Sequence, residues 1–383
     1  MRVLFVTHNF PRRTGDLPGN FLLRLAVALQ AVDVHVDVIA PHTAGLADSD
    51  TVDAVPVSRF HYAPDARETL AYGGTMAAQV AGSWRARVDL AKLIRAARRA
   101  TSQRAAGYDV VHAHWWFPSG LAVTSALRGT PPVVTTLHGS DVRFGVKSAV
   151  SRPLMRRTLR RSARVTAVSQ WLADQAHEVS GVVPLVAPMP ADTSLFTPEP
   201  AARGGLLFVG KLDAQKGLDV LLRALTHLPR DIGLTVVGDG IDAEALRATA
   251  GTLDLVDRIR WTGAQPQTAL PGFYRRAELV ITPAAAPEGL GLVGVEALLC
   301  ETPVIASDLG GARDIVESER TGLLVPPGDA AALARAIADA LGNASRRAEW
   351  GREGRTRMLA RFAPASCAAV YRTVYAEASR AGA

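Results

Sequence analysis

Short apolar runs alternate with longer amphipathic segments along most of this chain. The runs that predict strands in the first half are 2–7, 34–40, 109–113, 132–137 and 164–168, and in the second half 205–209, 232–237, 259–262 and 279–282. The intervening segments predict helices, for example at 19–31, 118–127, 151–162, 218–226 and 243–250. Such alternation is typical of parallel sheets that are covered by helices on both faces. The pattern therefore predicts an α/β protein.

The alternation is interrupted between residues 187 and 205. This stretch reads A-P-M-P-A-D-T-S-L-F-T-P-E-P-A-A-R-G-G, and its proline and small residues give it the composition of a linker. A chain of 383 residues is long enough for two domains that each bury a core. We therefore expect two doubly wound domains, at residues 1–190 and 203–362.

Composition narrows the class of protein. Hydrophobic residues make up 48% of the chain, yet no run reaches the roughly 18 apolar residues that a membrane-spanning helix needs. The first residues show no signal-peptide pattern, so a cytoplasmic location is expected. Cys300 and Cys367 are isolated in the sequence, which argues against a disulfide scaffold and against a zinc site.

The net charge of +7 is concentrated in two basic runs. The run from Arg85 to Arg104 holds seven basic residues and one acidic residue, and the run from Arg143 to Arg164 holds eight basic residues and no acidic one. A solvated helix face is the usual reason for such a run. The alternative is an anionic membrane surface, where each basic residue contributes about 1 kcal/mol. Few aromatic residues lie among these charges, so nucleic acid is not expected as a partner.

Candidate chemistry is densest in the segment 286–316, A-P-E-G-L-G-L-V-G-V-E-A-L-L-C-E-T-P-V-I-A-S-D-L-G-G-A-R-D-I-V. Glu288 is predicted in the loop after a strand, and Glu296 about two turns into the next helix. A helix N-terminus between them would offer free N–H groups and a positive dipole end to a phosphate. Two carboxylates beside such a site suit a phosphorylated ligand rich in hydroxyl groups. The alternative is that the glycines only shape turns and both glutamates are solvated.

The order of three motifs in this segment is more specific than the two glutamates alone. P-E-G-L-G-L-V-x-x-E-A, T-P-V-I-A-S and G-G-A-R-D-I-V together closely resemble the retaining glycosyltransferases of family four (glycosyl transferases group 1), which have the GT-B fold. The resemblance implies two Rossmann-like domains whose parallel sheets face each other across a cleft. It also implies an N-terminal acceptor-side domain, a C-terminal domain that binds a nucleotide-sugar donor, and a final helix, 363–383, that packs back on the first domain.

On this resemblance, the loop after the strand 279–282 and the helix that follows it bind the donor. Glu288 would lie near the hydroxyl groups of the sugar, and Glu296 would hold the ribose of the nucleotide. The backbone of the same stretch would meet the diphosphate, with Gly289, Gly291, Leu292 and Val293 as candidate residues.

Other loops complete the expected donor site. The loop G-K-L-D-A-Q-K-G, which follows a strand, carries Gly210, Lys211 and Lys216. The two lysines resemble the basic pair that neutralises the leaving diphosphate in the family, although the family usually has arginine at the first position. Fixed cations accelerate such a step because the departing phosphate gains negative charge in the transition state. The resemblance also places Gly19 against the donor phosphates and Gly263 beside the nucleotide base.

The motif T-T-L-H-G-S-D predicts a tight loop that carries His138 and Asp141 at the end of a strand. A single histidine is more often structural, but a position at the end of a strand favours a functional role. In the family, H-G-x-D loops line the donor sugar and the acceptor. His114 and Trp115 are further acceptor-side candidates with Asp141, although aromatic residues at such positions are as often part of a core.

The predicted catalytic residues are His138, Lys216 and Glu288. By resemblance, an acceptor hydroxyl on a glycan, a lipid-linked acceptor or a small molecule attacks the face of the sugar that the diphosphate leaves. A leaving phosphate oxygen takes the proton, and no metal or resident cofactor is expected. A covalent route through Glu288 is a less favoured alternative. Two other classes stay open: another GT-B enzyme, such as a sugar-nucleotide epimerase or a phosphorylase, and a non-catalytic protein that binds a membrane or a polymer.

Three further positions bear on these predictions. Asp48-Ser49-Asp50 resembles a metal-binding D-x-D motif, but it is predicted in a solvated polar loop with no strand before it. His112 shares a strand face with His114, but no third metal ligand is evident nearby. Glu301 stands where the family commonly has glycine. If its backbone is left-handed, a side chain costs about 1 to 2 kcal/mol, and the end of the helix would be rebuilt.

Overall fold

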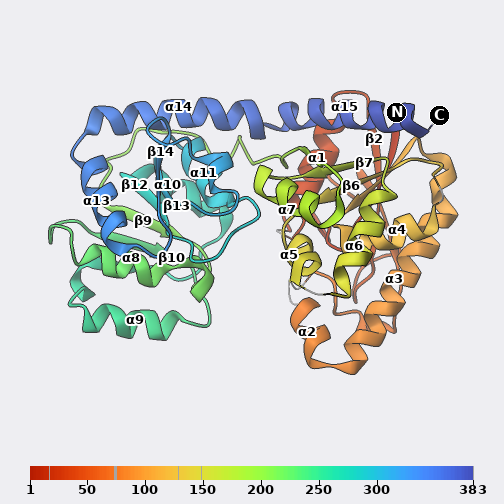
Figure 1. Cartoon of the computed structure of the whole chain (residues 1–383), viewed down its shortest axis with the longest axis horizontal. Helices are drawn as coiled ribbons and strands as arrows, with labels where there is room; N and C mark the ends of the chain where they lie inside the picture. The colour runs from red at the N-terminus through yellow and green to blue at the C-terminus, as the bar shows by residue number, and fades with distance from the viewer. Residues whose placement is uncertain (17, 73–75, 128, 148, 383) are drawn as a thin grey trace. The chain divides into compact units, whose positions relative to one another are not determined.

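Two separate sheets of mainly parallel strands, each with helices packed on both faces, account for most of the chain (Figure 1). The computed structural model describes residues 1–16, 18–72, 76–127, 129–147 and 149–382. Contacts divide it into unit 1, which comprises Met1–Pro190 and Pro364–Ala383, and unit 2, which comprises Ala191–Ala363. Both units therefore have the layered α/β organisation that the alternation of strands and helices predicts.

Unit 1 is built on an eight-stranded sheet in the order β3-β4-β2-β1-β5-β6-β7-β8. Its strands are β1 (Arg2–Val6), β2 (His35–Pro41), β3 (Ser49–Val52), β4 (Val55–Phe60), β5 (Val110–His114), β6 (Val133–Leu137), β7 (Arg164–Ala167) and β8 (Leu185–Val186). Every residue of β5 and β6 is buried. Helices cover both faces of these central strands, which is why their sequences lack a clean alternation of apolar and polar residues.

Helices from both ends of the chain cover the sheet of unit 1. They are α1 (Asn20–Gln30), α2 (Met76–Gly82), α3 (Trp84–Arg104), α4 (Leu121–Ala126), α5 (Ser140–Lys147), α6 (Ser151–Arg160), α7 (Gln170–Ser180) and α15 (Pro364–Gly382). The last of these packs against α1 and against β5, β6 and β7. Tyr371 and Tyr375 of α15 are fully buried, and the Tyr375 hydroxyl lies 2.8 Å from Nδ1 of His112. His112 is thus part of the core between the sheet and α15.

The β3–β4 hairpin was not expected from the sequence. Ser49 and Asp50 lie in β3, which pairs antiparallel with β4, so the prediction of a polar loop there is wrong. Three of the four residues of β3 are exposed, and the segment therefore lacks the apolar alternation by which a strand is recognised. Asp53 and Ala54, with φ of 46° and 65°, form the turn, as a type I′ hairpin requires.

Unit 2 is built on six parallel strands in the order β11-β10-β9-β12-β13-β14. They are β9 (Leu206–Val209), β10 (Leu234–Val237), β11 (Ile259–Trp261), β12 (Leu279–Thr282), β13 (Val304–Ser307) and β14 (Gly322–Val325). The helices are α8 (Leu218–Leu225), α9 (Ala243–Thr252), α10 (Leu270–Arg276), α11 (Leu292–Leu299), α12 (Ala312–Ile315), α13 (Ala330–Leu341) and α14 (Ala344–Phe362). Counted within the unit, the strand order is 3-2-1-4-5-6, which is that of the Rossmann fold.

The proline-rich segment 187–205 contains no helix or strand, as its composition predicts, but it is packed rather than free. Phe196 is fully buried, and its ring lies 5.8 Å from that of Tyr274. Arg275 donates a hydrogen bond of 2.6 Å to the carbonyl of Thr197. From Ala191 onward the segment therefore belongs to unit 2.

The structure corrects two details around α11. The helix begins at Leu292, so Glu296 is its fifth residue and lies little more than one turn in, not two. Glu301 has φ of 57°, so the left-handed condition stated for it is met. Its N–H donates to the carbonyl of Leu298, and the N–H of Thr302 donates to the carbonyl of Ala297. These are the two hydrogen bonds of a Schellman motif, in which an α-helix ends at a residue in the left-handed conformation. The end of the helix is therefore kept, with a glutamate in the position that glycine favours.

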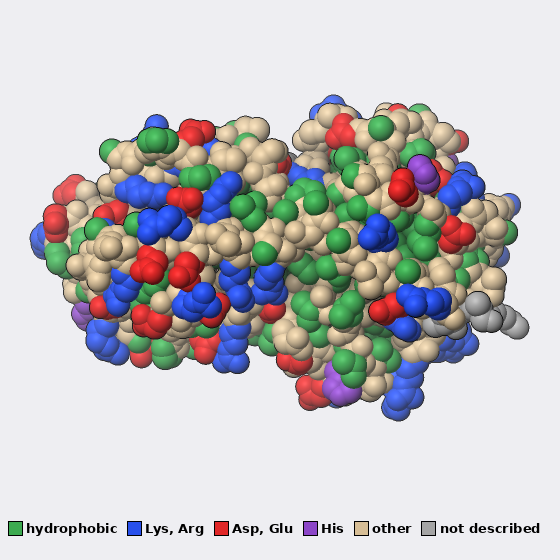
Figure 2. All heavy atoms as spheres, turned by 90° about the horizontal axis from the view of Figure 1, so that it is seen from above, with side chains coloured by type: hydrophobic (Ala, Val, Ile, Leu, Met, Phe, Trp, Pro, Cys, Tyr) green, Lys and Arg blue, Asp and Glu red, His purple; other side chains and the backbone are tan. Residues whose placement is uncertain are grey.

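Within the described residues, no helix is long and apolar enough to cross a membrane. On the face that Figure 2 shows, positive and negative side chains are interspersed, so this face carries no single large patch of one sign.

Candidate active site

The strand order of unit 2 places its ligand-binding edge beyond β9 and β12. These neighbouring strands lie where the order reverses, and ligands of open parallel sheets bind at the carboxyl ends of such strands. The loops that follow β9 and β12 touch each other. Gly217 has φ of 67°, and a Cβ there would lie 2.0 Å from the carbonyl of Pro283. The N–H of Ala285 donates to the carbonyl of Gln215 at 2.9 Å, which fixes the residue before Lys216.

Lys216 and Glu288 meet at this edge. The Lys216 ammonium forms an ion pair with Oε1 of Glu288, and both side chains are about one-third exposed, at 31% and 28%. Both line a pocket together with Gly291 and Val293 of the α11 N-terminus. Of the predicted donor residues, the structure thus brings these four together, and a fixed cation lies beside a carboxylate at the start of a helix.

A glycine pair holds the backbone of Glu288 in place. The N–H of Gly311 donates to the carbonyl of Glu288 at 3.0 Å. A Cβ on Gly310, which has φ of 56°, would lie 2.5 Å from that carbonyl, and one on Gly311 would lie 2.6 Å from the carbonyl of Gly289. This pair was not predicted to have a role, although G-G in the loop after a strand is a signal of close backbone approach.

Gly291 is the N-cap of α11, with the left-handed φ of 84°. A Cβ there would lie 3.4 Å from Oε2 of Glu288, so the carboxylate lies next to the helix start. The first N–H groups of a helix have no partner within the helix, and the dipole favours an anion there. Leu292 is 43% exposed at this position. The start of α11 can therefore receive a phosphate beside the Lys216 ammonium.

Glu296 is oriented by Tyr274, a residue that was not predicted to lie at the site. The hydroxyl of Tyr274 donates to Oε2 of Glu296 at 2.8 Å. Tyr274 is fully buried, and its pKa is raised well above the ordinary value by this burial and by the nearby Glu296 carboxylate. It therefore stays protonated and remains a donor. The sequence carries no local signal for this contact, because Tyr274 lies on α10 and Glu296 on α11.

Three loops with glycines meet at the ends of β9, β10 and β11. The N–H of Gly238 donates to the carbonyl of Gly263 at 2.9 Å, and a Cβ on Gly238 would lie 1.8 Å from the carbonyl of Gly210. Gly210 and Gly263 are thus adjacent to the same loop.

Lys211 points toward solvent, because its side chain is 68% exposed and its ammonium lies 3.6 Å from Asp213. The structure does not bring Lys211 to the Lys216–Glu288 pair.

In unit 1, β1 and β5 are the neighbours at which the strand order reverses. Gly19 caps α1 in the loop after β1, and its Cβ would lie 2.6 Å from the carbonyl of Asn9. The absence of a side chain is therefore explained by packing within unit 1. His8 follows the same strand, and its ring lies 4.6 Å from that of Trp115, which follows β5.

Asp141 fixes the loop that carries His138. One carboxylate oxygen of Asp141 accepts hydrogen bonds from the N–H groups of His138 (3.1 Å) and Gly139 (2.9 Å), and the other accepts from Trp116 (2.9 Å). Asp141 is only 4% exposed, and burial raises its pKa while these backbone donors oppose the rise. Its carboxylate therefore positions His138, and Asp141 also lines a cavity of unit 1.

His138 lies in a group of aromatic rings. Its Nε2 is 3.3 Å from Nδ1 of His114, and its ring centroid is 4.2 Å from that of Trp115. Burial lowers the pKa of His138 and of His114 well below the usual value and that of His8 to about 4, so these imidazoles are neutral near pH 7. His8 and Trp115 border a cavity of about 560 Å³, a size suited to a small ligand.

Two Rossmann-like units, the second with the Lys216 ammonium and a helix start at its switch point, are the architecture of the GT-B glycosyltransferases. Among solved structures, sucrose-phosphate synthase from Thermosynechococcus elongatus matches with a TM-score of 0.75 and 25% identity, over 98% of this chain and 99% of that one. Anabaena HepE, solved in complex with UDP, matches with a TM-score of 0.72 and 21% identity, over 98% and 100% of the two chains.

The sequence comparisons agree with the fold. The family model Glycosyltransferase Family 4 matches residues 19–195, and the model Glycosyl transferases group 1 matches residues 198–357. A D-inositol 3-phosphate glycosyltransferase of Xylanimonas cellulosilytica is 31% identical over 74% of this chain and 75% of its own length. A phosphatidyl-myo-inositol mannosyltransferase of Mycobacterium leprae is 32% identical over 62% and 65%. The chain belongs to the family-four, group 1 glycosyltransferases, which confirms the predicted family, fold and enzyme class.

Proposed function

We propose that this enzyme transfers a sugar from a nucleotide diphosphate sugar to an acceptor hydroxyl, with retention of configuration and without a catalytic metal. The observation that carries the proposal is the Lys216–Glu288 pair at the start of α11. It combines a fixed positive charge, free helix N–H groups and a carboxylate in one pocket. These are groups that suit a diphosphate and the hydroxyl groups of a sugar.

Each residue has a distinct part in this reaction. Lys216 and the α11 N-terminus stabilise the negative charge that develops on the leaving diphosphate, which is what a divalent cation does in other sites. Glu288 accepts hydrogen bonds from the sugar hydroxyls, and Glu296, oriented by Tyr274, holds the ribose. Glycine at 210 and 263 leaves room for the nucleotide beside the neighbouring loops.

The chemical step needs no additional reagent. The bond between the anomeric carbon and the diphosphate oxygen breaks, and the acceptor oxygen bonds to that carbon on the same face. The acceptor proton passes to the departing phosphate oxygen. The ion pair with Lys216 makes the Glu288 carboxylate a weaker nucleophile, which supports this route over a covalent glycosyl-enzyme.

Features of unit 1 support a polyol or glycan acceptor. In the part of the chain that the structure describes, the buried Nδ1 of His8 and Oδ1 of Asn9 have no hydrogen-bond partner, and both residues line the 560 Å³ cavity. Buried polar atoms normally have partners, so hydroxyl groups of a ligand would satisfy them. Trp115 and Phe144 give the cavity apolar ring faces on which a sugar or cyclitol ring can pack.

A lipid-linked acceptor at an anionic membrane is supported by the surface around α5 and α6. Arg152, Arg156 and Arg157 of α6 are exposed, while Phe144 and Val150 are 44% and 72% exposed beside them. Exposed apolar side chains next to basic ones are the combination that binds membrane interfaces. Co-sedimentation with vesicles that contain phosphatidylglycerol, compared with purely zwitterionic vesicles, tests this part of the proposal separately.

The function is tested by direct transfer. The purified chain is incubated with UDP-, GDP-, ADP- and TDP-sugars and inositol phosphate or glycan acceptors, and products are identified by mass spectrometry and by the anomeric coupling constant. Retention and equal rates with and without added Mg²⁺ or Mn²⁺ are expected. An inverted product, a strict requirement for added metal, or epimerised donor without transfer would overturn the proposal.

A further inference from the structure

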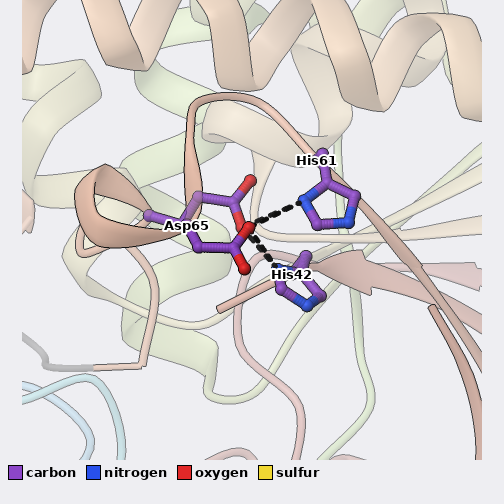
Figure 3. Close-up of side chains that lie close together, drawn as sticks. His42, His61 and Asp65 are labelled. Atoms are coloured by element: carbon purple, nitrogen blue, oxygen red, sulfur yellow. Dashed lines mark hydrogen bonds and ion pairs between the residues drawn. The ribbon is translucent and has the colours of Figure 1, made fainter. Parts of the chain in front are cut away.

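Two histidines and two carboxylates converge in unit 1, outside the residues discussed so far. They are His42, His61, Asp65 and Glu68, and their ligand atoms all lie within 4.8 Å of one another. Figure 3 shows His42 and His61 directed toward the carboxylate of Asp65. Neither Asp48-Ser49-Asp50 nor His112 and His114, the two metal patterns considered from the sequence, belongs to this cluster.

Strand register brings the two histidines together. β2 and β4 are parallel neighbours with Pro41 opposite Phe60, and each histidine is the first residue after its strand. The N–H of His42 donates to the carbonyl of Phe60 at 2.9 Å, and the two imidazole rings lie with centroids 3.9 Å apart at a tilt of 36°. Asp65 and Glu68 follow in the next turn of chain, around the short helix η1 (Asp65–Arg67).

Hydrogen bonds fix which ring nitrogen of each neutral histidine is free to bind a metal. Nε2 of His42 is 2.8 Å from the carbonyl of Leu46, and Nε2 of His61 is 3.0 Å from a carboxylate oxygen of Asp48. Both partners only accept, so each Nε2 carries a proton. When the ring is neutral, its Nδ1 therefore presents a lone pair. Metal-bound histidines have this arrangement, with the distal N–H bonded to a carbonyl or carboxylate.

Both Nδ1 atoms face carboxylate oxygens, where two lone pairs would repel without a cation between them. Oε2 of Glu68 lies 2.5 Å from Nδ1 of His42 and 3.3 Å from Nδ1 of His61. Oδ1 of Asp65 lies 4.0 Å and 3.7 Å from the same two atoms. The Glu68 side chain is fully buried, and its other oxygen accepts from the N–H of Tyr62 at 2.8 Å. The carboxylate is therefore held with one oxygen aimed at the histidines.

We propose that His42, His61, Asp65 and Glu68 bind one divalent zinc-type cation. Two imidazoles and two carboxylates are a ligand set that zinc accepts, and two carboxylates balance its charge. In a tetrahedral site with bonds of about 2.0 to 2.2 Å, ligand atoms lie roughly 3.3 to 3.6 Å apart. The four histidine–carboxylate separations above, from 2.5 to 4.0 Å, bracket this range. Movements of less than about 1 Å would complete the coordination.

The burial of the ligands supports a structural site with an entry path. His42 and Glu68 are 4% and 0% exposed, whereas His61 and Asp65 are 45% and 64% exposed. Four protein ligands close the coordination sphere, which is typical of structural zinc rather than catalytic zinc. The cation would tie the ends of β2 and β4 to the segment that continues to Leu70, which lines the unit 1 cavity.

The rival explanation places a proton where the cation would be. A protonated His42 would form an ordinary ion pair with Glu68, and His61 and Asp65 would then contribute little. The two accounts differ in whether the exposed residues matter, and in whether the folded chain responds to zinc.

The experiment uses the full-length chain after dialysis against a chelator. Zn²⁺ alone is titrated by calorimetry and in thermal unfolding, and Co²⁺ is used as a spectroscopic probe of tetrahedral coordination. We expect one equivalent of zinc, a raised Tm and tetrahedral cobalt absorption. His61→Ala and Asp65→Asn, both at accessible positions that should not impair folding, should weaken zinc binding at least about tenfold. Glu68→Gln keeps the acceptor for Tyr62 and should do the same.

His35→Ala is the matched control, because His35 is an exposed histidine on β2 outside the cluster. It should bind zinc as the unaltered chain does. The proposal is overturned if the folded chain binds no zinc. It is equally overturned if His61→Ala and Asp65→Asn bind zinc with undiminished affinity, which would place any bound metal elsewhere. These readouts do not depend on glycosyl transfer, so they fail or succeed independently of the proposed activity.

Discussion

Replacing Lys216 with alanine tests the donor site most directly. The change removes the ammonium from the pocket at the start of α11 and leaves Glu288 without this partner. A hydrogen bond that involves charged groups contributes about 1.5 to 3 kcal/mol. It is stronger in the transition state than with the bound donor, because the departing diphosphate carries more negative charge. We therefore expect Lys216→Ala to lose about 2 to 3 kcal/mol of transition-state stabilisation, roughly a 30- to 150-fold decrease in kcat/KM.

Effects on folding should be small enough to separate from this loss. Both partners of the ion pair are about one-third exposed, and such pairs contribute about 1 kcal/mol or less to stability. Urea unfolding of Lys216→Ala should therefore give a free energy within about 1 kcal/mol of the unaltered chain. Lys211→Ala is the matched control, since Lys211 lies in the same loop but is 68% exposed beside Asp213.

The assay is steady-state transfer at varied donor concentration for Lys216→Ala, Lys216→Arg and Lys211→Ala. Lys216→Arg should recover part of the rate because it keeps the charge but changes its geometry. Lys211→Ala should lose less than about fivefold, the equivalent of about 1 kcal/mol. A Lys216→Ala variant with kcat/KM within threefold of the unaltered enzyme, or a Lys211→Ala variant that is equally impaired, would refute this reasoning.

Tyr274, Glu301 and the buried histidines allow further tests at single residues. Tyr274→Phe removes the donor to Glu296, so the affinity for a nucleoside diphosphate measured by calorimetry should fall about tenfold; unchanged affinity would contradict the ribose role. Glu301→Gly removes the strain of a side chain in the left-handed conformation, which is about 1 to 2 kcal/mol, but adds the conformational entropy that glycine loses on folding. The free energy of unfolding should therefore rise by roughly 1 kcal/mol. A less stable variant would show that the glutamate side chain makes compensating interactions. Burial lowers the pKa of His8 to about 4 and that of His112 to about 3, whereas the unfolded chain takes up these protons near about pH 6.5. The stabilisation from these neutral histidines should therefore be complete above about pH 6.5, and the free energy of unfolding should decrease as the pH falls toward 4. In His8→Gln this decrease should be less steep. If urea titrations give the same pH dependence for both proteins, they argue against a buried neutral His8.

The local arrangement of the donor-site candidates can be predicted from short, ordered motifs. Glu288 and Gly291 lie within four residues of each other, and a strand, a glycine loop and a helix start dictate their arrangement locally. Lys216 could be assigned to the same site because both loops follow strands of one parallel sheet, whose carboxyl ends share an edge. The family resemblance implies roles for these residues, and the geometry gives the reason why they meet.

Contacts between distant elements are where sequence reasoning fails. Tyr274 contacts Glu296 because α10 packs against α11, and the sequence periodicity of neither helix predicts that contact. His42 and His61 are brought together by the register of β2 with β4, and the exposed hairpin strand β3 between them lacks an apolar pattern. The tertiary arrangement of strands decides such sites, and it cannot be derived from local spacing.

Unit 1 is built from two segments that lie on either side of unit 2 in the sequence, which affects the order in which the two cores can form during synthesis. Unit 2 is one continuous segment, Ala191–Ala363, so all its core residues are available before the last helix has been synthesised. Unit 1 lacks Tyr371 and Tyr375 until α15 emerges, and until then the buried His112 on its sheet has no cover from that helix. The core of unit 1 can therefore be completed only after all of unit 2 has been synthesised. Loss of α15 alone would expose the sheet of unit 1 and leave the core of unit 2 complete.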